Sequence, residues 1–320
     1  MNPADNLYSQ FPFLLEDINA VKGVMAESLA GGNAEAKEAL SRFVESPGKM
    51  LRPLLLVLGA RMGNFQAEKT YRLAASVEML HIATLIHDDI VDNSPLRRGQ
   101  PTLHTTEGVH KAVLLGDYLF TLCFRLVADY ALPESARMLA GSVGQICQSE
   151  MSQVRTGQIT KRRYLRTIYG KTALLFMMAL GMGGAENGCP KEVQSLLRSI
   201  GYGIGAGFQI QDDILDYSGT QDEMGKPAGN DSLDSLRTLP LILAMNKGNT
   251  RLGRLISLSV GKHRAGKIRR EVAASGALEE AAAAAGYYFD GALKLTERLP
   301  RGDAKDALVC LIEAMRNRKK

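Results

Sequence analysis

The chain has 320 residues, of which 45% are hydrophobic and 23% are charged, and its formal net charge is +5. These values exclude a disordered or fibrous protein and are typical of a globular protein with one large core. The small positive charge fits an anionic ligand or an ordinary solvated surface, and we expect no nucleic-acid partner. The four cysteines have neither zinc-site spacing nor the density of a secreted disulfide framework, so we expect buried free thiols in a cytoplasmic protein.

Apolar residues recur at helical spacing through most of the sequence, and alternating strand-like runs are rare. In chain order, the pattern predicts helices over residues 51–61, 71–90, 113–130, 134–153, 162–180, 191–217 and 277–299. No long polar linker separates them, so we expect an all-α fold, with residues 1–320 forming a single large helical bundle around a central cavity. We expect no signal peptide, and the apolar stretch 172–185 is shorter than the roughly 20 residues of a membrane span.

A six-residue acidic pattern occurs twice, each time at the end of a predicted helix. The first copy is HDDIVD at residues 87–92, and the second is QDDILD at residues 211–216. Positions i, i+1 and i+4 of a helix lie within about 100° of one another, so each copy places three carboxylates on one face. Three such charges repel unless cations neutralise them, and Mg²⁺ prefers oxygen ligands. We therefore predict Mg²⁺ sites at Asp88, Asp89, Asp92, Asp212, Asp213 and Asp216, although one copy alone would be read as a solvated helix end.

Basic residues lie near the first acidic motif and at the start of an apolar helix. Arg97 and Arg98 follow the motif in a turn-like run, and Lys49 and Arg52 lie three apart where the helix 51–61 begins. Guanidinium groups beside metal sites, and N–H groups at a helix start, favour anions. Either pair alone would be weak support, because a solvated loop has the same composition. Together with the acidic motifs, they indicate a metal-bridged diphosphate.

Two glycine-containing segments do not indicate nucleotide binding. The motif of a P-loop requires a preceding strand and a further glycine, which the segment before Lys171 and Thr172 lacks. The glycines at positions 201, 203, 205 and 207 follow a helical pattern rather than a strand. We expect them to allow close helix packing.

In this order, the motifs resemble those of the trans-isoprenyl diphosphate synthases, the polyprenyl synthetase family, over nearly the whole chain. The resemblance rests on the two acidic motifs and on Gly48-Lys49-x-x-Arg52-Pro53, His81, Arg97-Arg98-Gly99, Lys171-Thr172, Phe208-Gln209 and Gly225-Lys226. It implies an isoprenoid-synthase fold and a prenyltransferase that joins isopentenyl diphosphate to an allylic diphosphate.

The resemblance also implies a role for each matching residue. The diphosphate of isopentenyl diphosphate would be bound by Lys49, Arg52, His81 and Arg98. The aspartates would bind about three Mg²⁺ on the allylic diphosphate. Positive charge on that leaving group would come from Arg97, Lys171 and Lys226, and the carbocation would face Thr172 and Gln209. Ionisation would be followed by attack of the alkene and by loss of a proton to the departing diphosphate.

The chain departs from the family pattern in one segment. Ser235 and Leu236 stand where the family usually has Gly-Lys, and Arg237 follows. A second lysine on the allylic diphosphate is therefore missing, or Arg237 substitutes for it.

Product length in this family depends on the residues just before the first motif. Here they are the small residues Ala83 and Thr84, so we expect a tunnel that admits a product of about thirty to forty carbons. A shorter farnesyl or geranylgeranyl product is the alternative. Ala83 and Thr84 could also be small only because the helices pack closely there, with no role in product length.

Two other classes of protein would share part of this pattern. A terpene cyclase or head-to-head condensing enzyme would use similar metals but would not need Lys49, Arg52 and Arg98. A non-catalytic partner subunit of a hetero-oligomeric synthase would be expected to lose an acidic motif, and both are intact. The resemblance implies a homodimer. The basic segment 316–320 could make a peripheral contact with anionic lipid.

Overall fold

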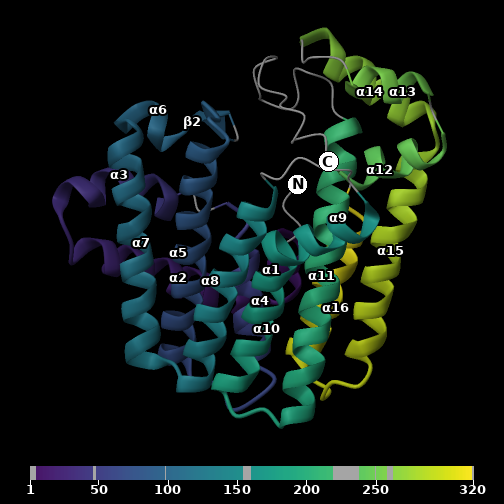
Figure 1. Cartoon of the computed structure of the whole chain (residues 1–320). Coiled ribbons are helices and arrows are strands. Elements are labelled where there is room, and N and C mark those ends of the chain that lie inside the picture. The colour runs from purple at the N-terminus through teal and green to yellow at the C-terminus, as the bar shows by residue number, and fades with distance from the viewer. Residues whose placement is uncertain are drawn as a thin grey trace.

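The computed structural model describes residues 5–45, 48–97, 99–153, 160–218, 238–248, 250–257 and 262–318. These residues fold into packed α-helices (Figure 1), together with a short antiparallel pair, β1 (Leu96–Arg97) and β2 (Gln100–Pro101). The predicted all-α fold is confirmed.

The first half of the chain forms the helices up to α8. They are α1 (Asp5–Gln10), α2 (Pro12–Ala30), α3 (Ala34–Glu45), α4 (Leu51–Ala60), α5 (Ala67–Val91), α6 (Leu103–Glu107), α7 (Val109–Tyr130) and α8 (Pro133–Gln153).

The second half begins with a continuous helical segment that contains a π-helical turn, η1. The elements are α9 (Lys161–Ile168), η1 (Tyr169–Ala173), α10 (Leu174–Glu186), α11 (Lys191–Ser218), α12 (Leu239–Asn246), α13 (Thr250–Ser257), α14 (Lys262–Ala274), α15 (Ala277–Thr296) and α16 (Asp303–Arg316). The helices predicted from the sequence are all present, but the one expected over 162–180 is interrupted by η1 and continues to Glu186.

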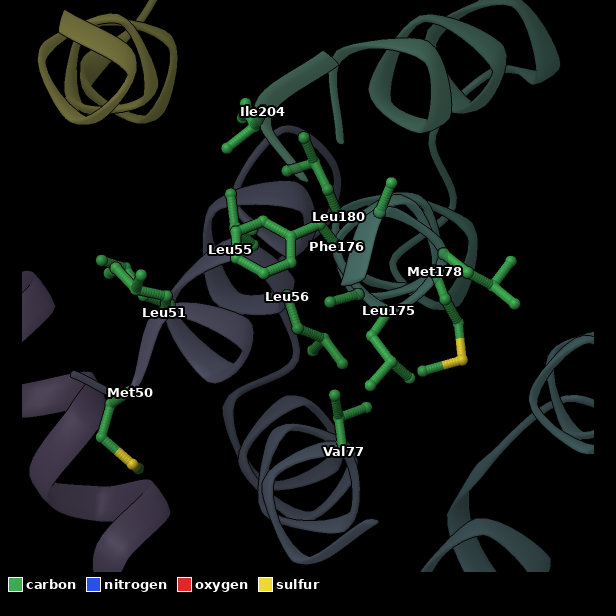
Figure 2. Packing of buried hydrophobic residues seen from close by; sticks show 14 of the residues in the cluster. Met50, Leu51, Leu55, Leu56, Val77, Leu175, Phe176, Met178, Leu180 and Ile204 are labelled. Carbon is green, nitrogen blue, oxygen red and sulfur yellow. The ribbon is translucent and has the colours of Figure 1, made fainter. Parts of the chain in front are cut away.

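The core is built around α4, α5, α10 and α11. In α4 every residue except Arg52 is buried, as expected of a helix that is apolar on all sides. Figure 2 shows Leu55 and Leu56 of α4 packed beside Phe176 and Leu175 of α10. Buried apolar side chains from Leu7 to Met315 form one contiguous cluster, so the central helices have fixed positions relative to one another.

Glycines let α11 approach α10 and η1 closely. A Cβ atom on Gly201 would lie 2.7 Å from the Cα of Met177, and one on Gly205 would lie 2.6 Å from the Cα of Ala173. Real Cβ atoms do not approach backbone so closely, so only glycine fits there. The prediction that these glycines serve helix packing is confirmed.

The helical stretch Lys161–Glu186 is long and apolar enough to cross a membrane by length and composition, but 78% of its apolar window is buried inside the protein. That burial is typical of a core helix. Cys123 and Cys189 are buried free thiols as predicted. Cys147 is exposed and Cys310 is only half-buried, so the prediction of burial is wrong for these two thiols.

Candidate active site

The first acidic motif lies at the carboxyl end of α5. Asp88 and Asp89 belong to its last turn, and Asp92 caps it. The helix stops there because Asn93 adopts a left-handed conformation with φ 48°, which asparagine tolerates. Carboxylates at this end face the negative pole of the helix dipole, so the motif is stabilised by added cations.

The side chain of Arg97, on β1, binds the buried carboxylate of Asp89. Its Nε lies 2.8 Å and 2.9 Å from the two carboxylate oxygens, and its Nη2 lies 2.7 Å from Oδ1. Asp89 is only 6% exposed, so this fork of charge-assisted hydrogen bonds holds it firmly. Arg98 lies outside the described residues.

Asp88 lies in a charged group with Lys171 of η1 and Glu150 of α8. Burial raises the pKa of Asp88 to about 6; Lys171 opposes this rise, whereas Glu150 and Asp92 add to it. The Nζ of Lys171 lies 3.5 Å from Oε1 of Glu150. Burial lowers the pKa of Lys171, but Asp88 and Glu150 raise it above its ordinary value overall. Lys171 is therefore an ammonium ion held beside the first motif.

The second acidic motif lies in the last turns of α11, where Asp213 is buried. Its Oδ2 accepts a 2.6 Å hydrogen bond from the hydroxyl of Tyr164, and its Oδ1 accepts a 2.9 Å bond from Nε2 of Gln209. Burial raises the pKa of Asp213 to about 7, and these two hydrogen bonds oppose the rise. Both oxygens of Asp213 are thus engaged by protein donors, whereas Asp216 is exposed.

The turn η1 connects the two motifs. Lys171 lies close enough to Asp88 to change its pKa, and the neighbouring Thr172 donates a hydrogen bond to Oε1 of Gln209. Gln209 in turn donates to Asp213. Single π-helical turns inside α-helices are frequent at functional sites. Here, one such turn places adjacent residues against the two acidic helix ends.

Lys49 and Arg52 lie over two aromatic rings beside the second motif. The Nζ of Lys49 is 5.6 Å from the ring centroid of Phe208, and the Cζ of Arg52 is 5.0 Å from that of Phe176. The two rings are 5.6 Å apart. Met50, between the two cations, has a left-handed backbone with φ 49°, and such strain in a non-glycine residue clusters at ligand sites.

Arg318 also reaches this cluster, from the C-terminal end of the chain. Its Nη2 pairs with Oδ1 of Asp212, and its Cζ lies 4.9 Å from the ring centroid of Phe208. The Nε2 of Gln211 donates a 3.2 Å hydrogen bond to the carbonyl oxygen of Arg318.

The remaining predicted residues lie on α5 or outside the described residues. His81 is half-buried, about two turns before Asp88 on the same helix. Ala83 is fully buried, and Thr84 is half-buried and donates a 2.8 Å hydrogen bond to the carbonyl of His81. Lys226 and the segment 235–237 are not among the described residues.

Among the residues that the structure describes, no three carboxylate, imidazole or thiol groups form a ready metal cluster. Mg²⁺ does not need one, because it is usually bound by one or two carboxylates and completes its shell with water and substrate phosphates. Burial raises the pKa of the half-buried Asp88 to about 6 although Lys171 and Arg97 oppose the rise, so an added cation would favour its charged form. The donor set therefore fits Mg²⁺ delivered with a diphosphate.

Three contact residues were not predicted from the sequence. They are Glu150 beside Lys171, Tyr164 on Asp213, and Arg318 on Asp212. Glu150 lies on a mixed polar helix, Tyr164 follows three basic residues, and Arg318 belongs to a basic tail. None of these contexts differs from an ordinary surface pattern, so only the tertiary structure reveals the contacts.

Comparison with known proteins gives consistent similarities. The sequence profile of the polyprenyl synthetase family matches residues 33–273. The chain is 31% identical over 306 residues to heptaprenyl diphosphate synthase component 2 of Geobacillus stearothermophilus, covering 94% of this chain and 96% of that protein. It is 32% identical over 315 residues to octaprenyl diphosphate synthase of Escherichia coli strain K12, covering 93% and 97% of the two chains. The crystal structure of a polyprenyl synthase from Caulobacter crescentus complexed with calcium and isoprenyl diphosphate matches with a TM-score of 0.88 at 31% identity, covering 99% of this chain and 98% of that one.

Proposed function

We propose that this chain elongates an allylic diphosphate with isopentenyl diphosphate to a long trans-polyprenyl chain. The premise is that the chain belongs to the polyprenyl synthetase family and is a prenyltransferase. One observation carries the proposal. Two acidic helix ends are linked through Lys171 and Thr172 of η1, and the cations Lys49 and Arg52 lie over aromatic rings on the adjoining surface.

The proposed Mg²⁺ ligands come from both acidic motifs, for about three ions. Within the described part of the chain, no protein hydrogen bonds hold both carboxylate oxygens of Asp88, Asp92 or Asp212, and Asp216 is exposed. These four carboxylates are therefore suited to bind Mg²⁺ directly. Asp89 and Asp213 are held by Arg97 and by Tyr164 with Gln209, which suits a role in orienting their neighbours. Bound Mg²⁺ would stabilise the charge that develops on the departing diphosphate.

The protein's own cations would hold the allylic diphosphate while its carbon–oxygen bond breaks. Lys171 carries a raised pKa and stays charged, and Arg97 lies beside the first motif. Arg98 and Lys226 are assigned to the two diphosphates on the family resemblance alone. The hydroxyl of Thr172 and the amide of Gln209 would place oxygen dipoles near the carbocation, where fixed dipoles stabilise positive charge.

Isopentenyl diphosphate is proposed to bind at Lys49, Arg52 and His81. Its phosphate oxygens would accept hydrogen bonds from Lys49 and Arg52, and the rings of Phe208 and Phe176 would keep water from their stems. Its alkene would then face the allylic carbon held between α5 and α11. The proton lost after attack would go to the departing diphosphate.

We further propose a product of about thirty to forty carbons, because neither Ala83 nor Thr84 carries a bulky side chain just before the first motif. The heptaprenyl and octaprenyl names of the two relatives fit this range. A shorter farnesyl or geranylgeranyl product is the alternative.

A second candidate is that the chain acts only together with a different partner chain. One relative is named component 2 of a synthase, which favours this reading. A homodimer in the cytoplasm is the simpler assembly, and it would cover the exposed apolar side chains along α7, which are Val109, Val113, Leu114 and Phe124. Because both acidic motifs are intact, the chain itself would remain the catalytic component.

The proposed function can be tested with the purified chain alone. It is incubated with Mg²⁺, farnesyl diphosphate and labelled isopentenyl diphosphate, and the products are separated by chromatography. Elongated product that is lost in Asp88→Asn and Asp212→Asn, but kept in the surface control Asp290→Asn, supports the proposal. Cyclised hydrocarbon, or no turnover at any enzyme concentration until a second protein is added, contradicts it, and light scattering gives the assembly state.

A further inference from the structure

The side chain of Arg318 is only 9% exposed, although long charged side chains are mostly solvated. Arg316, only two residues earlier, shows the ordinary behaviour: it pairs at 2.9 Å with Asp290 on α15 and is 43% exposed. The burial of Arg318 is therefore specific to that residue.

Three residues on one face of α11 hold Arg318. The Cζ of Arg318 lies 4.9 Å from the ring centroid of Phe208, and Nε2 of Gln211 donates a 3.2 Å hydrogen bond to the backbone carbonyl of Arg318. Oδ1 of Asp212 accepts a hydrogen bond from Nη2 of Arg318. Their spacing of i, i+3 and i+4 puts them side by side on the helix. The chain end is thus anchored by its main chain and its side chain together.

The pairing leaves one donor of Arg318 unused. Its Nη1 is buried and has no hydrogen-bond partner within the part of the chain that the structure describes. A guanidinium has five N–H donors, and a buried unsatisfied donor is unfavourable. The arginine therefore fits this position incompletely, and a cation with better ligation of Asp212 can displace it.

We propose that Arg318 is a positioning residue of the active site: it neutralises and orients Asp212 in the metal-free protein, and it leaves this carboxylate when Mg²⁺ binds with a diphosphate. The inference rests on the proposed function, because it takes Asp212 as a metal ligand. The physical reason is that Oδ1 of Asp212 is the atom that Arg318 contacts, and two cations at one carboxylate oxygen repel each other.

Competition has a measurable consequence for metal binding. Without the arginine, Mg²⁺ no longer has to displace a bound cation, so the concentration of Mg²⁺ that half-saturates the protein should fall. Arg318→Gln should lower it about fivefold or more in the presence of inorganic diphosphate, read from thermal stabilisation rather than from activity. Arg318→Lys keeps a positive charge and should give a smaller fall. Arg316→Gln removes the neighbouring exposed arginine and should leave the value unchanged.

The accessibility of the chain end gives an independent measurement. Carboxypeptidase B removes C-terminal lysine and arginine and would stop at Asn317, so intact mass reports the loss of Lys320, Lys319 and Arg318 in turn. Without Mg²⁺, digestion should pause before Arg318. Adding Mg²⁺ and inorganic diphosphate should speed the removal of Arg318 about fivefold or more, because proteolysis follows the population of the released state. Removal of the two lysines serves as the internal control for protease activity.

Asp212→Asn completes the test, because it weakens the pair without touching the tail. In this variant Arg318 should be removed rapidly both with and without Mg²⁺ and diphosphate. If Arg318 of the wild-type chain is removed at the same rate in both conditions, or is better protected by Mg²⁺ and diphosphate, while thermal stabilisation shows that they bind, the inference is wrong and the proposed function stands. If Mg²⁺ and diphosphate give the wild-type chain no stabilisation at all, both are overturned.

Discussion

The hydroxyl of Tyr164 and the carboxylate of Asp213 form a 2.6 Å hydrogen bond between two buried side chains on α9 and α11. Burial and the nearby carboxylate raise the pKa of Tyr164, so the phenol stays protonated and is the donor. Its donation opposes the rise in the pKa of Asp213 that burial causes. The bond therefore keeps Asp213 closer to its ionised form beside the second acidic motif.

Tyr164→Phe should lower kcat/KM by about tenfold to a hundredfold, because a hydrogen bond to a charged group contributes about 1.5–3 kcal/mol. The pKa of Asp213 should rise further, so the acid limb of the pH–rate profile should shift to higher pH. Tyr287→Phe removes the hydroxyl of a tyrosine that is 76% exposed and should change neither quantity. A wild-type pH profile in Tyr164→Phe would show that the bond serves packing alone.

Asp213→Asn should change how the stability of the metal-free protein depends on pH. The folded pKa of Asp213 is raised from 3.8 to about 7, so the folded state holds a proton that the unfolded state has lost. Its contribution to stability is full below about pH 4 and is lost as the pH rises to about 7. Asparagine does not titrate, so the Asp213→Asn variant should not lose this stability as the pH rises.

The measurement is the thermal midpoint of both proteins without Mg²⁺ at several pH values from about 4.5 to 7.5. The difference between wild type and Asp213→Asn should move steadily in favour of the variant as the pH rises. A difference that is constant with pH would mean that Asp213 is ionised in the folded protein throughout this range.

Gly205→Ala should destabilise the protein by about 1–3 kcal/mol, because the new Cβ would lie 2.6 Å from the Cα of Ala173 in η1. Displacing η1 should also reduce kcat, since Lys171 and Thr172 move with it. Gly291→Ala on α15 is the control, as nothing lies within 4 Å of its added Cβ, and it should be neutral or stabilising by about 0.5–1 kcal/mol. Chemical denaturation and steady-state kinetics measure both effects, and equal stability of the two variants would contradict the assigned contact.

Ala83→Phe should shorten the main product to about fifteen or twenty carbons, because the ring would block a chain running down from the first motif. Ala83 is fully buried, so the larger side chain also costs stability. Thr84→Phe is a second test at a half-buried position, and it should shorten the product with less loss of stability. Unchanged product length in folded, active samples of both variants would refute the tunnel assignment.

Much of the fold could be predicted from the sequence because helical periodicity is a local signal. The start of α11 at Lys191 and the end of α7 at Tyr130 both agree with the predicted ranges. The turn η1 was not predicted, because the apolar pattern of an α-helix continues through Leu165 and Ile168 into Leu174 without a break. Periodicity over so few residues does not separate a π-helical turn from an α-helical one.

The position of both acidic motifs at helix ends was predicted from the sequence and agrees with the structure, whereas their binding of metal stays a prediction. Glu150 and Tyr164 act through contacts across the bundle, to Lys171 and Asp213, that no local pattern encodes. Within the motifs themselves, the buried contacts of Asp213 distinguish it from the exposed Asp216, a difference that the repeated sequence does not reveal.

The π-helical turn also sets a rule for length in this part of the chain. A π-helical turn closes its hydrogen bonds over five residues instead of four, so it holds one residue more than an α-helical turn. Deleting one residue within Tyr169–Ala173 would therefore return this turn to α-helical geometry and leave Tyr164 and Phe176 on their present faces. Inserting one residue would instead rotate one flanking helix by about 100° relative to the other and separate Tyr164 from Asp213.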